Sequence, residues 1–215
     1  MEKIIDKIGA FDFLSVFFVG ILSNSIISIS INANIFCYGE TDFIKGMSFV
    51  ALFWHGIVIQ QIALLIDQIT FNIRDKYKHN YLDRKNGVFK IETDYNNCVN
   101  IILKIIGTSD ITQITHKDCK YIYNYCKSYL EKSNYIHLIN NTTTLLASYR
   151  NLSVLLCFFI VFFTVLSFIN TPIFVIGVLT SSILLPLFLW RSHNLAKYRV
   201  RQVFLYYKLM NDENH

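Results

Sequence analysis

Residues 151–190 read NLSVLLCFFIVFFTVLSFINTPIFVIGVLTSSILLPLFLW and contain no acidic or basic side chain. A helix of about 20 apolar residues crosses the hydrocarbon core of a bilayer, so an uncharged stretch of 40 residues suffices for two crossings. The tripeptide Asn170–Pro172 interrupts the apolar sequence, and residues of these types favour a turn. We therefore expect two membrane-spanning helices here, Leu152–Ile169 and Ile173–Trp190.

Two further uncharged stretches of similar length precede this pair, Phe13–Ile31 and Gly46–Ile66. The whole chain is 53% hydrophobic and only 16% charged, against the roughly 25% charged residues of an average soluble domain. Because an open sheet would leave backbone groups unpaired in lipid, helices are expected at all four stretches. The sequence thus predicts an all-α membrane protein with four transmembrane helices.

The four expected spans divide the chain into parts. The second and third spans are separated by some eighty residues, which is long enough for a small folded insert. The expected parts are an N-terminal transmembrane pair at 1–69, a cytoplasmic insert at 70–150, a C-terminal transmembrane pair at 151–190 and a basic tail helix at 191–215.

The distribution of basic residues predicts the orientation of these spans. Of the 20 Lys and Arg residues, all but Lys45 fall on one side of a four-span arrangement. The positive-inside rule assigns that side to the cytoplasm, together with both termini and the insert. A cleaved signal peptide is the alternative for the N-terminus, but Met1–Lys7 holds as many acids as lysines and no small-residue cleavage motif follows.

The insert is expected to be mostly helical. Apolar residues at helical spacing between Tyr95 and Ile106 predict an amphipathic helix that stops at Gly107. Thr115 with Asp118 three residues later resembles a capping box that opens a second helix. Asn86-Gly87, between two short segments with β-forming residues, predicts a small β-hairpin over residues 81–92.

The sequence offers no catalytic motif. It contains no nucleotide-binding loop, no nucleophile elbow and no zinc-binding helix, and the expected spans carry no acidic residue. His116, Cys119 and Cys126 could be drawn as metal ligands, but a fourth ligand is missing and the spacing matches no zinc motif. We therefore expect neither enzymatic activity nor a cofactor.

Polar and small residues within the first two spans are candidate contact residues. A polar side chain is stable in lipid only where it meets another polar group or water. Two uses remain open: packing within the bundle or between subunits, or the lining of a water-filled path. The candidates are Gly20, Asn24 and Ser28 in the first span and His55, Gly56, Gln60 and Gln61 in the second.

The tail after the last span is a basic amphipathic helix. Such a helix at a membrane surface binds anionic lipid headgroups or docks a cytoplasmic partner, and the two uses can coexist. Direct binding to nucleic acid is not expected, because the basic residues are few and belong to no recognised motif. The candidate contact residues are Arg191, Lys197, Arg199 and Arg201.

The order of these parts resembles a group of small four-span bacterial membrane proteins found in anti-phage defence loci. Among them, it is most similar to the family of Kiwa membrane subunits, KwaA. The resemblance covers the whole chain and is carried by its architecture and by four short sequence strings. These strings are Phe11–Leu14, Gln60–Asp67, Tyr149–Leu152 and Tyr198–Arg201.

This resemblance implies an inner-membrane homo-oligomer, most simply a tetramer, that senses infection at the membrane and anchors a cytoplasmic, DNA-binding KwaB-like partner. It implies no catalytic residue. An alternative of another class is a pore-forming or membrane-disrupting effector, gated by a nucleotide second messenger bound to the cytoplasmic insert. An accessory protein of a membrane chaperone or transporter is a third interpretation.

Overall fold

The computed structural model describes residues 16, 18–30, 42–68, 73–133, 135–169 and 174–213. Within these ranges the chain is helical and contains no β-strand. It divides into two compact units. The first unit comprises Met1–Thr70 and Thr144–Ser192, and the second comprises Phe71–Thr143 and His193–His215.

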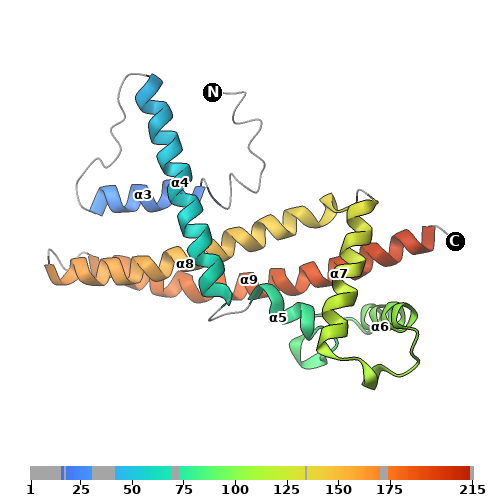
Figure 1. Cartoon of the computed structure of the whole chain (residues 1–215). Coiled ribbons are helices and arrows are strands. Elements are labelled where there is room, and N and C mark those ends of the chain that lie inside the picture. The colour runs from blue at the N-terminus through green and yellow to red at the C-terminus, as the bar shows by residue number, and fades with distance from the viewer. Residues whose placement is uncertain are drawn as a thin grey trace. The chain divides into compact units, whose positions relative to one another are not determined.

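In the first unit, α3 (Phe18–Ser30) crosses α4 (Asp42–Ile66), as Figure 1 shows. Both helices consist largely of apolar residues, in keeping with the sequence prediction of helices in these two stretches. The crossing is close because Gly20 of α3 and Gly56 of α4 have no side chains to separate the two backbones.

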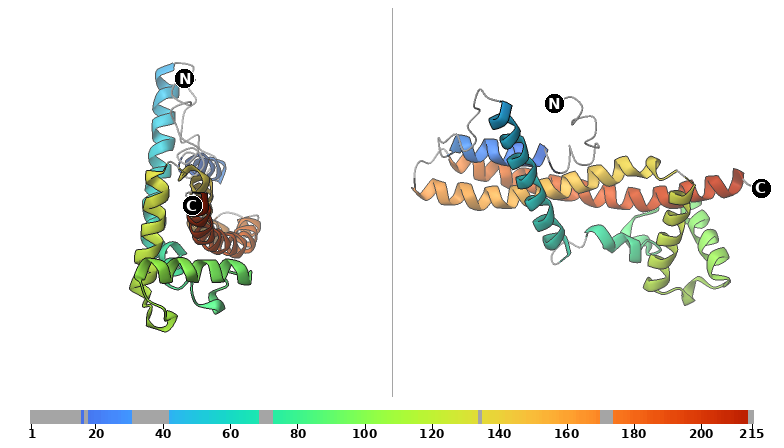
Figure 2. Two further views of the ribbon diagram at one scale, coloured as in Figure 1. Left: turned by 90° about the vertical axis from the view of Figure 1, so that its right-hand side faces the viewer. Right: turned by 45° about the horizontal axis from the view of Figure 1, so that its top comes forward.

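The other two helices of the first unit are parts of α8 (His137–Ile169) and α9 (Phe174–Glu213). They run side by side in opposite directions (Figures 1 and 2). The rings of Tyr149 and Phe188 lie 5.5 Å apart near one end, and those of Phe163 and Phe174 lie 6.3 Å apart near the other. Apolar contact between α3, α4 and α8 forms the core of this unit, with Val19, Ile59, Leu155, Leu156 and Phe159 buried.

Two of the described helices are long and apolar enough to cross a membrane, Ile139–Phe168 and Phe174–Asp212. They include the two expected spans, Leu152–Ile169 and Ile173–Trp190, except for Ile169 and for Ile173, which lies outside the described residues. Leu52–Ile66 of α4 is apolar but shorter. The all-helical prediction and the C-terminal pair of apolar helices are thus confirmed for the described residues, whereas four membrane crossings remain a prediction.

The second unit contains short helices around the second half of α9. Local signals in the sequence set two of its helix boundaries. As predicted, Gly107 ends one helix, with a φ of 76°, and a reciprocal capping box between Thr115 and Asp118 opens the next. The helices are α5 (Ile73–His79), η3 (Arg84–Asn86), α6 (Glu92–Ile106), η4 (Ile111–Gln113) and α7 (His116–Lys132).

The predicted β-hairpin is absent from residues 81–92. Asn86 ends a short 3-10 helix, whose start is capped by the Asp83 carboxylate accepting from the Lys85 N–H at 2.9 Å. Gly87 alone takes the left-handed conformation, with a φ of 59°, whereas a type I′ turn needs positive φ at two successive residues. Tyr81 and Val88 point into the core, so tertiary burial replaces strand pairing.

The core of the second unit joins the insert to the tail. Tyr81 donates a hydrogen bond to the Cys119 carbonyl at 3.1 Å, and its ring packs against Phe204 of α9 at 4.9 Å. Thr142 donates to the Gln202 side-chain oxygen at 2.7 Å, which joins the start of α8 to α9. The tail is therefore part of this unit, whereas the sequence suggested a separate segment.

Candidate functional site

The small residues predicted to mediate contact lie at the α3–α4 crossing. A Cβ atom added to Gly56 would overlap the backbone carbonyl of Val16, and one added to Gly20 would overlap that of Leu52. The contact is backbone against backbone, which lets helices approach closely in lipid. The structure thus uses Gly20 and Gly56 within one chain, and their part in subunit assembly remains a prediction.

A polar pair bridges the same two helices. The Ser23 hydroxyl and the His55 ring nitrogen Nε2 are hydrogen-bonded at 3.2 Å. His55 was a predicted site residue, and Ser23 was not singled out. The available signal was the spacing, because Ser23 lies three residues after Gly20 and therefore near the same helical face. This bond meets the need of a polar group in an apolar environment.

The other site residues predicted in the first two spans differ in how far they are buried. Asn24 is buried, Gln60 is half-buried and Gln61 is exposed. Ser28 belongs to α3, but its side chain lies outside the described part of the structure. The structure therefore brings His55 to α3 and leaves Gln61 on the surface.

An apolar cavity of about 640 Å³ lies beside this polar pair. Ser23 and His55 contribute to its wall, and every other lining residue is aliphatic or aromatic. Such a lining favours an apolar occupant over a column of water. The apolar lining residues are Val58, Ile59, Ile62, Leu155, Phe158, Phe159, Val161, Phe162 and Val165.

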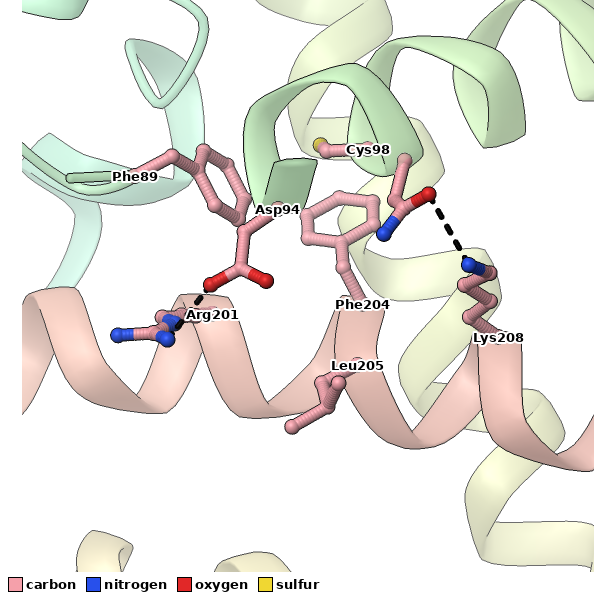
Figure 3. Close-up of a pocket in the computed structure, with 8 residues that line it drawn as sticks. Phe89, Asp94, Cys98, Arg201, Phe204, Leu205 and Lys208 are labelled. Atoms are coloured by element: carbon pink, nitrogen blue, oxygen red, sulfur yellow. Dashed lines mark hydrogen bonds and ion pairs between the residues drawn. The ribbon is translucent and has the colours of Figure 1, made fainter. Parts of the chain in front are cut away.

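The basic tail residues, predicted to contact lipid or a partner, lie in different environments. Arg191 is exposed, whereas only 9% of Arg199 is exposed. Arg201 forms an ion pair with Asp94 of α6 at 2.6 Å (Figure 3). Arg201 thus joins α9 to α6, so its charge is largely balanced within the second unit.

Lys197 belongs to a cluster of three lysines, which we call the basic cluster: Lys76, Lys90 and Lys197. The Nζ atoms of Lys197 and Lys76 lie 5.4 and 5.8 Å from the centre of the Tyr77 ring, a favourable arrangement for a cation. Burial and the nearby charges of Lys90 and Lys76 lower the pKa of Lys197. Two cations at one ring, with a third close to Lys197, attract an anionic group.

Tyr77 is itself held in place. Its hydroxyl is hydrogen-bonded to Nδ1 of His193 in α9 at 3.1 Å, and the two rings meet edge to face. Burial raises the pKa of Tyr77, so the phenol stays neutral at physiological pH. The basic cluster is therefore built on a buried, fixed residue that sequence analysis did not identify.

The residues weighed as metal ligands have other roles. His116 is exposed and its Nδ1 contacts the His79 carbonyl at 3.1 Å, whereas Cys119 and Cys126 are buried. Burial raises the pKa of Cys119 to about 11 and that of Cys126 to about 12, so both remain thiols at neutral pH. Among the described residues, no group of three or more His, Cys, Asp or Glu side chains could hold a metal ion.

Comparison of the chain with protein-family models, with curated proteins and with solved structures found no match.

Proposed function

We propose that the chain is a multi-pass membrane protein that carries a folded helical unit on the cytoplasmic side of a bacterial inner membrane. The exposed apolar surface of the first unit is the main support. Phe168 is 86% exposed, Ile183 64% and Trp190 63%, although all three lie in long apolar helices. Apolar side chains in such number face lipid or another protein surface.

The orientation of this proposal follows from charge. In the four-span arrangement, the basic cluster and Arg191 lie on the same side as both termini. Reporter fusions after Asn86 and at the C-terminus should therefore behave as cytoplasmic, and a membrane-impermeant label should reach Cys37 from outside. A periplasmic signal from the fusion after Asn86 would overturn the orientation.

The proposed role is that of the membrane subunit of an anti-phage defence complex, similar to KwaA, which senses infection and anchors a cytoplasmic KwaB-like partner. The resemblance in the order of parts supports this role. The basic cluster adds a surface suited to an acidic partner or to anionic lipid headgroups. The protein is proposed to act as a homo-oligomer, most simply a tetramer, without catalysis of its own.

Charge reversal in the basic cluster tests the anchoring role. Lys76→Glu, Lys90→Glu and Lys197→Glu together should abolish protection against phage and release the partner from membranes, while insertion is retained. The matched control is Lys117→Glu, Lys120→Glu and Lys127→Glu on α7, which changes the net charge equally at another surface. The role of the cluster would be contradicted if both variants lost protection equally, or if the variant of the basic cluster retained it.

The assembly state is tested separately, by native mass spectrometry in mild detergent. A tetramer is expected, and a monodisperse monomer at micromolar concentration would contradict it. Gln60→Leu should weaken assembly only modestly, because hydrogen bonds between membrane helices contribute about 0.6 kcal/mol on average.

A membrane-disrupting effector gated by a bound nucleotide is the second candidate. A groove of about 670 Å³ in the second unit favours it, because this volume is that of a small-ligand site and the lining includes Asn100, Lys104 and Tyr121. Membrane potential, measured with a dye in cells that express this chain alone, separates the two functions. Rapid depolarisation without a stable partner would favour the effector, whereas an unchanged potential and a co-purifying partner would favour the anchor.

A further inference from the structure

A groove of about 670 Å³ lies within the second unit, between α6, α7 and the last turns of α9. Its volume falls in the range of small-molecule sites, which measure about 300–1,000 Å³. It is separate from the apolar cavity of the first unit and from the basic cluster. Its lining combines aromatic rings, amides and lysines with Ile101, Ile105 and Asp212.

Tyrosines form one wall of the groove. Tyr121 and Tyr125 lie one turn apart on α7, and 64% and 44% of their surfaces are exposed. The ring of Tyr207 lies 6.3 Å from that of Tyr125 and is largely buried. Exposed rings beside a buried ring provide flat surfaces on which a planar ligand can stack.

Amide side chains line the groove beside these rings. Asn97 and Asn100 come from α6, and Asn211 comes from α9. Each amide has both a hydrogen-bond donor and an acceptor, so the set can pair with the edge of a heteroaromatic ring. Asn97 already accepts a hydrogen bond from Lys208 at 3.0 Å, whereas Asn100 is exposed on the groove.

Two lysines contribute positive charge, in different settings. Lys208 lies 4.0 Å from the carboxylate of Asp212, so its charge is partly balanced. Lys104 is exposed and forms no ion pair with any residue that the structure describes. It stands seven residues after Asn97 on α6, about 10 Å along the helix. An anionic group is therefore best placed at Lys104, whose charge no described ion pair balances.

We infer that this groove binds a nucleotide, with the base against Tyr121 and Tyr125, its edge at the asparagine amides and its phosphates at Lys104. The three features are those that a nucleotide requires: a stacking surface, hydrogen-bonding groups and a cation at one end. A lipid would need a more apolar lining, and a bare phosphate would not use the tyrosines. The inference does not depend on the anchoring function proposed above, and it assigns to particular residues the nucleotide site that the second candidate function requires.

Calorimetric titration of the full-length protein in mild detergent tests this inference. ATP, GTP, CTP and UTP are each titrated, together with adenosine and inorganic triphosphate. Saturable binding of at least one nucleotide is expected, with a dissociation constant below about 1 mM, and adenosine and triphosphate should each bind at least about tenfold more weakly than the tightest-binding nucleotide. Failure of all four nucleotides to bind would overturn the inference, as would triphosphate binding as tightly as the tightest-binding nucleotide.

Substitutions in the groove assign the binding to its residues. Tyr121→Ala should weaken nucleotide binding about tenfold, because stacking on an aromatic side chain is lost, whereas Tyr121→Phe should retain it. Lys104→Ala should weaken binding severalfold and reduce its dependence on salt. These side chains are exposed, so the variants should fold as the wild type does, which circular dichroism checks.

The matched control is Lys120→Ala, an exposed residue of α7 next to Tyr121 that does not line the groove. It should leave binding unchanged. Equal weakening by Lys120→Ala and Lys104→Ala would show a diffuse charge effect and overturn the assignment. Loss of a co-purifying protein in Tyr121→Ala, without nucleotide binding by the wild type, would identify the groove as a protein-docking surface instead and also overturn it.

Discussion

The two parts of α9 differ in where they place their apolar side chains. Before Ser192, large apolar residues such as Ile176, Ile183 and Trp190 are exposed. After His193, one face of the helix is buried in the second unit, where Val203 and Phe204 are almost completely inaccessible, whereas Tyr198, Leu205 and Leu209 on other faces are exposed. One continuous helix thus meets two environments along its length.

This difference shows what stabilises each part. The second half of α9 is amphipathic, so burial of one face against α6 and α7 contributes to folding in water. In the first half, apolar side chains occur on all sides of the helix. Such a helix is stabilised only when its whole surface is removed from water. The comparison therefore predicts that truncation of an apolar side chain destabilises the second half of α9 more than the first. A new charge should disfavour the first half more than the second.

The largest expected effect is that of Phe204→Ala. The Phe204 ring is buried against Tyr81 at 4.9 Å and Phe89 at 6.1 Å, so its removal should lower the free energy of unfolding of the second unit by about 3–5 kcal/mol. Urea unfolding followed by limited proteolysis measures this. The control, Phe168→Ala in the first unit, should change stability by less than about 0.5 kcal/mol. A similar loss at Phe168 would mean that this surface is buried against other copies.

Introduction of a charge should affect the first half of α9 more than the second, the reverse of what is expected for truncation to alanine. Ile183→Arg places a charge in the first half of α9 and should disfavour its insertion by about 3 kcal/mol, whereas Tyr198→Arg in the second half should have little effect. A glycosylation tag at the C-terminus reports the result in microsomes, because failure of the last crossing moves the tag to the lumen. Equal glycosylation of the two variants would contradict the membrane assignment of α9.

Gly56→Ala tests the α3–α4 crossing. The added methyl group would overlap the Val16 carbonyl, a backbone group that cannot turn aside as a side chain can, so a loss of about 1–3 kcal/mol is expected. The control is Gly177→Ala, whose new Cβ would overlap the ring of Phe163, 2.7 Å away, which is a side chain and not backbone and can therefore shift more easily. Thermal unfolding in detergent measures both variants. If Gly177→Ala destabilised as much, the special role of the crossing would be disproved.

The buried thiols should make the second unit less stable in alkali. Unfolded cysteines ionise above about pH 9, but burial raises the pKa of Cys119 to about 11 and that of Cys126 to about 12. Above pH 9 the unfolded state therefore binds fewer protons, and stability falls by about 1.4 kcal/mol per pH unit for each thiol. Cys126→Ala should reduce this slope, as urea unfolding between about pH 8 and about pH 10.5 would show. An unchanged slope in Cys126→Ala would be inconsistent with a buried thiol.

Features set by neighbouring residues could be predicted from the sequence. The capping box of Thr115 and Asp118 spans three residues, and the stop at Gly107 depends on one glycine. The helices of the C-terminal pair follow from an uninterrupted apolar stretch. These signals depend on residues within one or two helical turns of each other, so they can be recognised without knowledge of the tertiary structure.

Features that join distant segments could not be predicted. The Asn86-Gly87 pair favours a hairpin locally, but burial of Tyr81 and Val88 and the cap at Asp83 determine the observed turn. Arg201 was expected to face lipid or a partner, yet its carboxylate partner Asp94 lies 107 positions earlier in the chain. Nor does any local pattern bring Tyr121 to the same groove as residues of α6 and α9.

The position of the tryptophans has a practical consequence for spectroscopy. The chain has two tryptophans, Trp54 and Trp190, and both are well exposed in the first unit. Their emission is sensitive to solvent polarity, so a transfer from water to lipid should shift it to shorter wavelengths. The second unit holds no tryptophan. Intrinsic fluorescence therefore distinguishes the two units without any label, and it can follow membrane insertion while the rest of the chain is being unfolded.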